Sequence, residues 1–358
     1  MKTTQRKEYL DILRGIAMIS IVLGHLGIPS VNRVVFTYHL PVFFLITGYF
    51  TREGQPLPAL IRKRARTLLV PYAVSCAVIT VLRVLWYGVR HGSASSEAVT
   101  WILASLYASG SSGLLPPGIS RIGAIWFLWA TFWACILLNL ILRLPEKFRI
   151  AAVLGIFFAG YFSARKLLLP LSIQPGACAL LYLYIGHLVR KYETHFLETG
   201  REWKVSALTL AAVVWISFIV HFQGFWIVSC NFGNGAEDIF ASLCASLVLT
   251  VTCCGLDRLT GLSGQPHMGN AFFATLLKGI AFLGRYSIAM LFMHIIELDV
   301  FPYGGLLTRL NAHGMPASMN LAVTILIKLL IIIPGTILLV RTKAGRRIFG
   351  FRDSGHKT

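Results

Sequence analysis

Charge is scarce in this sequence of 358 residues, because Asp, Glu, Lys and Arg together make up only 13% of it. A soluble globular domain carries about twice that share. Hydrophobic residues make up 56% of the chain. Together these proportions exclude a soluble enzyme, a disordered chain and a secreted disulfide scaffold. A polytopic integral membrane protein is the class that remains.

Acidic residues are the scarcer of the two charged types, with 14 Asp and Glu against 33 Lys and Arg, so the net charge is +19. In a soluble protein such an excess would suggest nucleic acid binding. In a membrane protein, basic residues mark the cytoplasmic loops and meet anionic lipid. We therefore expect the lipid bilayer, and no nucleic acid, as a partner.

Paired cysteines and alternating strand patterns are also missing. The seven Cys are scattered, form no Cys-x-x-Cys motif and lie mostly inside apolar runs, which indicates small buried side chains and no metal site. The apolar runs show no sustained alternation of apolar and polar residues, so strands are not expected.

Long apolar runs occupy most of the chain. A helix needs roughly 20 apolar residues to cross a bilayer. The runs predict an all-α fold of about ten transmembrane helices in one membrane-embedded domain over 1–358, with no separate soluble domain. The runs are 9–27, 34–51, 67–87, 121–142, 149–163, 167–189, 204–222, 238–255, 279–299 and 319–340.

The orientation follows from the distribution of Lys and Arg. With the N-terminus inside, 24 of the 33 basic residues fall in inner segments and six in outer ones. This bias, together with an even number of helices, predicts cytoplasmic N- and C-termini and a multi-pass protein of the plasma (inner) membrane. The first apolar run is expected to be a retained helix rather than a cleaved signal. The segment 88–120 is expected to be the longest outer loop.

Ionisable residues inside membrane helices are costly and usually face the protein interior or a cavity. Arg14 and His25 are eleven residues apart in the first run. On a helix this spacing places them roughly 20° apart on one face. Each also has a structural interpretation: Asp11 could neutralise Arg14, and His25 could be a hydrogen-bonded interfacial histidine.

Two further sites carry histidine. His39 begins the second run, and a short loop separates it from His25, so the two imidazoles could share a cavity. In the ninth run, His294 has Glu297 at i+3 and Asp299 at i+5. Glu297 is better placed to meet His294, because i+5 lies about 140° round a helix.

Several motifs, in order along the chain, resemble acyltransferase family 3 of integral membrane O-acyltransferases, most closely its fucose 4-O-acetylase-like branch. The resemblance spans nearly the whole chain and departs at Thr47, where the family commonly has Ser. The matching motifs are Asp11-x-x-Arg14-Gly15 followed by His25, His39-x-Pro-x-Phe-Phe-x-x-Thr47-Gly48-Tyr-Phe, Arg64-x-x-x-Leu-Leu-Val-Pro71-Tyr72, Trp126-Phe-Leu, and Leu283-Gly-x-x-Ser287 before His294.

The resemblance implies transfer of an acyl group, most simply acetyl from acetyl-CoA, to a hydroxyl of a cell-envelope or exported polysaccharide. An alcohol is a poor nucleophile and needs a base with a pKa near neutrality, which suits histidine. We assign His25 as the general base and His39 as its partner, which orients it or stabilises the oxyanion. Arg14 is assigned to the catalytic site and to the donor.

Two more groups of residues are assigned to the substrates. The basic run that contains Arg64 and Arg66 is interpreted as the site for the nucleotide end of acetyl-CoA, or else as a positive-inside anchor. Trp126, His294 and Glu297 are assigned to the carbohydrate acceptor, although the last two could simply satisfy each other. No metal is expected.

Other functions stay open. A polysaccharide or lipid transporter or flippase would also place charges inside helices, but it often has internal repeats, and none is found here. Within the enzyme class, the acyl group could be succinyl and the acceptor need not be a sugar. The absence of a Gly-x-Ser-x-Gly elbow disfavours a serine acyl-enzyme on an α/β-hydrolase fold.

Overall fold

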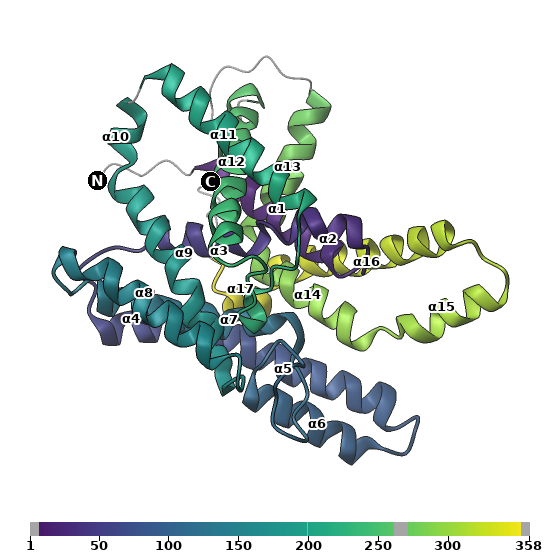
Figure 1. The fold of residues 1–358 in the computed structure, drawn as a ribbon. Coiled ribbons are helices and arrows are strands. Elements are labelled where there is room, and N and C mark those ends of the chain that lie inside the picture. The colour runs from purple at the N-terminus through teal and green to yellow at the C-terminus, as the bar shows by residue number, and fades with distance from the viewer. Residues whose placement is uncertain (1–6, 199, 261–270, 352–358) are drawn as a thin grey trace. The chain divides into compact units, whose positions relative to one another are not determined.

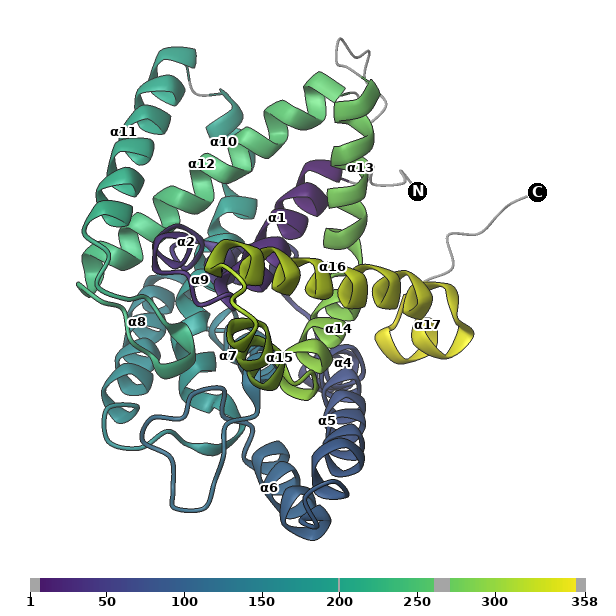
Figure 2. The same cartoon turned by 90° about the vertical axis from the view of Figure 1, so that its right-hand side faces the viewer.

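The computed structural model of the chain describes residues 7–198, 200–260 and 271–351. Over these residues the backbone is helical, with connecting loops and one isolated bridge between Trp226 and Asn231 (Figures 1 and 2). No strand forms anywhere in this described part. The all-α prediction is therefore confirmed for it.

The chain divides into two compact units. The first comprises residues 1–61, 130–168 and 173–287. Its helices are α1 (Glu8–Gly24), α2 (Pro29–Val35), α3 (His39–Tyr49), most of α7 (Trp126–Ile141), α8 (Glu146–Ser163), α9 (Ile173–Lys191), α10 (Glu193–Glu198), α11 (Arg201–Val220), η5 (Ile227–Ser229), α12 (Ala236–Thr260) and α13 (Ala271–Arg285).

The second unit comprises residues 62–129, 169–172 and 288–358. Two of its turns, η1 and η2, are π-helical. They lie within one continuous helical stretch from Leu57 to Gly88 and replace α-helical turns there. Its elements are the end of α4 (Leu57–Arg64), η1 (Ala65–Leu69), α5 (Val70–Arg83), η2 (Val84–Gly88), α6 (Ala94–Tyr107), η3 (Gly123–Ile125), η4 (Pro170–Ser172), α14 (Ser287–Val300), α15 (Tyr303–Ala312), α16 (Ala317–Arg341) and α17 (Lys343–Phe349).

Six helical stretches among the described residues are long and apolar enough to cross a membrane, or seven if the bent pair α13 and α14 forms one span. The predicted count of about ten is therefore not confirmed. The remaining runs do form helices, but α1 has 17 residues, α3 has 11, and α8 begins with charged residues. The orientation of the termini stays a prediction.

The surfaces of the long helices fit a lipid environment. In the apolar stretch of α11 only 11% of the residues are buried within the protein, and in that of α16 only 17%. Large apolar side chains such as Leu210, Ile216 and Leu330 stay more than half exposed. Exposed apolar surface of this extent marks contact with a membrane or a partner, and on spanning helices of this length lipid is the natural neighbour.

The prediction that 88–120 is a loop is wrong over part of its length. Residues Ala94–Tyr107 form α6, which runs beside α5 in both views (Figures 1 and 2). Gly88 allows this return, because a side chain at its position would collide with the backbone of Ala94. The sequence did not indicate α6 because the helix has only 14 residues and begins with polar ones.

The core of the first unit forms where α1 packs against α13 and where α3 packs against α9. Both contacts depend on glycine. A Cβ at Gly15 would overlap the backbone of Ile280, and a Cβ at Gly284 would overlap that of Asp11. In the same way, Gly48 of α3 lies directly against the backbone of Leu183. Small residues at helix crossings let backbones approach closely in membrane proteins, and here they fix the helices that carry Arg14, His25 and His39.

Candidate active site

Helix α1 carries the first two predicted site residues. The side chain of Arg14 is partly exposed, and its Nη1 lies 3.5 Å from Oδ1 of the buried Asp11. The guanidinium also stacks over the ring of Phe50, 5.6 Å from its centroid. The predicted neutralisation by Asp11 is therefore present, and it leaves part of the guanidinium accessible to a ligand.

His25 lies directly after the last residue of α1 and its side chain is exposed. Its Nδ1 lies 2.8 Å from the carbonyl oxygen of Ile21. A carbonyl can only accept a hydrogen bond, so Nδ1 carries the proton and Nε2 is the nitrogen that can take up another. This is the tautomer that a general base needs. The helix is continuous from Arg14 to Gly24, which maintains the predicted spacing of the two residues.

His39 has a different environment. It is the first residue of α3, its exposed fraction is only 5%, and its Nδ1 lies 2.7 Å from the carbonyl oxygen of Val35. Its ring packs edge-on against Phe36 at a centroid distance of 4.9 Å. The predicted short loop between the two histidines contains helix α2. Burial on this scale favours a positioning role for His39 over direct proton transfer.

The basic run belongs to the second unit and lies in the continuous helix, at the end of α4 and the start of η1. Arg66 is exposed, whereas Arg64 is partly buried. The buried Nε of Arg64 has no hydrogen-bond partner among the described residues. A buried donor without an acceptor is costly, and an anionic oxygen would satisfy it. This observation fits the predicted site for the phosphates of acetyl-CoA.

The predicted acceptor residues are in the second unit and are deeply buried. His294 Nδ1 lies 3.0 Å from Glu297 Oε2, which confirms the expected i+3 contact. The other carboxylate oxygen of Glu297 accepts a hydrogen bond from Lys328 Nζ at 2.7 Å. Trp126, at the start of α7, is 5% exposed. His294 is fully buried, and its imidazole lies against the carboxylate of Glu297.

Lys328 is the residue that sequence reasoning missed in this group. It lies in the middle of α16, 31 residues beyond Glu297, and its side chain is 4% exposed. A lysine inside an apolar run is a signal by itself. Its partner could not be chosen from the sequence alone, because the acidic residues lie far from it along the chain.

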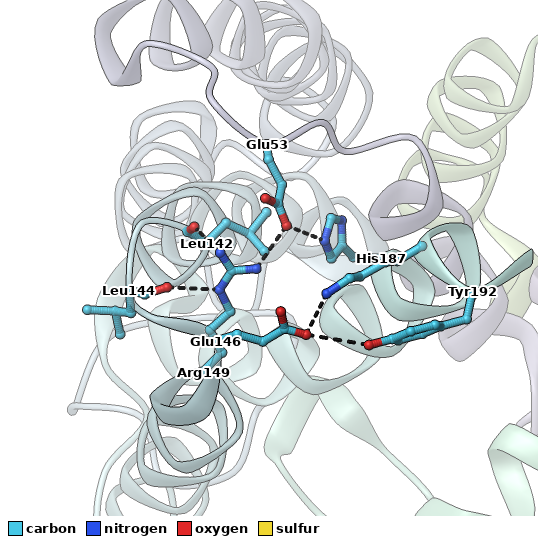
Figure 3. Close-up of polar contacts among 8 residues, drawn as sticks. Glu53, Leu142, Leu144, Glu146, Arg149, His187 and Tyr192 are labelled. Carbon is cyan, nitrogen blue, oxygen red and sulfur yellow. Dashed lines mark hydrogen bonds and ion pairs between the residues drawn. The ribbon is translucent and has the colours of Figure 1, made fainter.

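A second group of polar residues, also missed, lies in the first unit (Figure 3). Glu53 Oε1 accepts hydrogen bonds from Arg149 at 2.8 Å and His187 at 3.1 Å. Burial opposes ionisation of Glu53, but these two bonds outweigh it and hold the pKa of its carboxyl below the usual range. Beside them, Lys191 donates to Glu146 at 2.5 Å. Residues so far apart in the sequence give no pattern that predicts their meeting.

Comparison with known proteins agrees with the motifs. A model of a family described as an acyltransferase domain matches residues 7–341. Two relatives named nodulation protein NolL, from Mesorhizobium japonicum and Sinorhizobium fredii, are 25% identical over 159 residues and 26% identical over 146. These alignments cover 39% and 36% of this chain.

The chain spans little more than a third of each of these relatives, 37% and 35% of their lengths. No solved structure matches it. The family match, in contrast, extends over all the helices that carry Arg14, His25, His39, Arg64 and His294. The chain therefore belongs to the acyltransferase family that its motifs resemble, acyltransferase family 3.

Proposed function

We propose that the chain is a membrane O-acyltransferase that moves an acetyl group from acetyl-CoA to a sugar hydroxyl of a cell-envelope or exported polysaccharide. The observation that carries the proposal is helix α1. It holds a partly exposed Arg14 beside Asp11, and at its end an exposed His25 whose Nε2 can accept a proton. The family match extends over this helix.

His25 acts as the general base. Its Nε2 removes the proton of the sugar hydroxyl while the hydroxyl oxygen attacks the carbonyl carbon of the thioester. A C–O bond forms, the C–S bond breaks, and the imidazolium returns the proton to the departing sulfur of CoA. General acid–base catalysis of this kind contributes about 10²–10⁴ to the rate.

His39 and Arg14 support this step in different ways. His39 is buried and hydrogen-bonded to Val35, so it is proposed as a positioning residue that holds the start of α3 against the end of α2. Arg14 supplies positive charge where the oxyanion develops, or pairs with the donor. Stabilisation of developing charge by a fixed donor is a large contribution in acyl transfer.

The donor is proposed to bind through its phosphates at Arg64 and Arg66. Arg64 offers a buried Nε without a partner among the described residues, and Arg66 offers an exposed guanidinium. Guanidinium groups bind phosphate oxygens in a bidentate manner, which a simple membrane anchor does not require. The second unit also holds Glu297, which is proposed to contribute to the acceptor site together with Trp126 and His294.

The test is a His25→Ala variant, compared with His221→Ala by mass spectrometry of cell-envelope glycans. His221 is a matched control because it is also exposed at a helix end, with Nδ1 3.0 Å from the carbonyl oxygen of Ser217. We expect His25→Ala to lose the acetyl mass, with membrane abundance unchanged, and His221→Ala to retain it.

A well-expressed His25→Ala protein that still acetylates its glycan at the wild-type level would overturn the mechanism. A lost mass that corresponds to succinyl would retain the enzyme class and the base but replace the donor. Unchanged glycans after deletion of the gene would overturn the polysaccharide acceptor.

A further inference from the structure

A cavity in the second unit has features that the proposed function does not yet use. It has a volume of about 650 Å³, within the range of pockets that bind small ligands. Its lining comes from the end of the long helix Leu57–Gly88 and the turn that follows it, from α14, from α15 and from Ile331 of α16. The residues that give it chemical character are Trp86, Tyr87, Arg90, His91, Glu297 and Arg309.

Two aromatic residues of the lining come from an irregular turn of the long helix. Trp86 and Tyr87 lie in the π-helical turn η2, which is wound more widely than an α-helix. Such turns are rare and are frequent at functional sites. Trp86 is 41% exposed, and the ring of Tyr87 stacks on that of His91 at 6.1 Å. Arg83 also lies over the ring of Tyr87 at 4.0 Å, so the exposed ring of Trp86 is the one that offers a flat apolar face with a polar edge, which suits a sugar ring.

The charge of the cavity is positive. Neither Arg90 nor Arg309 forms an ion pair with an acidic residue within the described ranges, although Arg90 lies over the ring of Trp86 at 4.4 Å. Nearby Arg83 shows the contrast, because it is held by Glu97 at 2.6 Å. Glu297 is the acidic residue of the lining, and Lys328 and His294 already occupy its carboxylate. Two guanidinium groups therefore remain to attract an anion.

We propose that this cavity binds the acceptor and that it selects a sugar that carries an anionic group. The sugar ring packs against the exposed ring of Trp86, and its carboxylate or phosphate is bound by Arg90 and Arg309. The substrate class is thus an acidic glycan rather than a neutral one. This inference rests on the proposed transfer to a polysaccharide and adds the chemical feature by which the acceptor is recognised.

The experiment measures binding to the purified full-length protein in detergent, without acyl donor, by isothermal titration calorimetry. The probes are tetragalacturonate and, as a neutral sugar of the same length, maltotetraose. We expect tetragalacturonate to bind at least tenfold more tightly than maltotetraose, and more weakly as salt is raised, because screening reduces charge attraction.

Three variants place the binding in this cavity. In Arg90→Gln/Arg309→Gln, the affinity for tetragalacturonate should fall tenfold or more, since hydrogen bonds to charged groups are the strong ones. Trp86→Ala should also weaken binding, and Trp86→Phe should retain most of it. Lys166→Gln removes one exposed charge from the first unit and is the matched control; it should bind as the wild type does.

Equal affinity for the two sugars, or undiminished binding by the double arginine variant, would overturn the inference. Competition by glucose 1-phosphate would show that phosphate serves as the anion, and its failure to compete would assign the site to carboxylates; both results retain the anionic sugar. Because no donor is present, these outcomes are independent of the His25 test. A failure of the proposed transfer reaction can therefore be distinguished from a failure of the proposed acceptor site, because the first is measured by glycan acetylation and the second by sugar binding.

Discussion

At the scale of single residues, the three predicted histidines have three different environments. His25 is exposed at a helix end, His39 is buried against Phe36, and His294 is fully enclosed beside Glu297. Their positions within or beside apolar runs indicated that all three are unusual for a membrane helix. It did not indicate which of them a substrate can reach, because exposure depends on what packs around each ring.

The buried ion pair between Lys328 and Glu297 gives a prediction at this scale. Lys328→Met leaves a buried carboxylate without its ammonium partner, and breaking such a pair costs about 3–5 kcal/mol. We expect a clear loss of thermal stability in detergent, measured by a fluorescence-detected unfolding assay. In the double variant Lys328→Met/Glu297→Gln the unpaired charge is absent, so stability should recover in part. If the single variant is as stable as the wild type, the pair is not buried as described.

At the scale of elements, glycine contacts position the helices that carry the site. Gly48 of α3 lies directly against the backbone of Leu183, which a Cβ at this position would overlap. Gly186 makes the reciprocal contact, with the backbone of Leu45. The two residues let α3 and α9 lie against each other without intervening side chains. Helix α3 begins with His39, so this contact also fixes the position of that ring.

Gly48→Ala tests the role of this contact. The added methyl group meets backbone atoms rather than a flexible side chain, so the helices must separate, and overpacking of this kind costs about 1–3 kcal/mol. We expect a lower midpoint of thermal unfolding and reduced acetylation. Gly155→Ala is the matched control, because Gly155 lies in α8 and a Cβ there meets nothing within 4 Å; alanine should leave stability equal or higher. Similar stability losses in both variants would contradict the packing argument.

At the scale of the whole molecule, hydrophobic composition and basic loops determine how the chain relates to a membrane. The described helices expose apolar side chains over much of their length, as a lipid environment requires. Six or seven of them satisfy the length and composition of a membrane span. The number of crossings decides whether the two termini lie on the same side, so the predicted orientation needs a direct measurement.

We predict a cytoplasmic C-terminus from the 24 basic residues assigned to inner segments. A fusion of alkaline phosphatase to the C-terminus should be inactive, because that enzyme requires the oxidising exterior, whereas a fluorescent protein fused at the same point should be bright. A phosphatase inserted at Gly113, in the segment expected outside, should be active and serves as the positive control. An active C-terminal phosphatase would reverse the predicted orientation.

The sequence by itself determined the all-helical class, the membrane environment and the family, because each depends on local properties: apolar runs, scarce charge and motifs with short spacing. It also determined the contact between His294 and Glu297, which are three residues apart on one helix. Only the tertiary structure decided that Lys328 pairs with Glu297, that Glu53 meets Arg149 and His187, and that α6 packs on α5. The first two contacts join segments far apart in the chain, and the third joins neighbouring helices across a turn that the sequence did not indicate. Their energy comes from burial and pairing that exist only once the helices are packed.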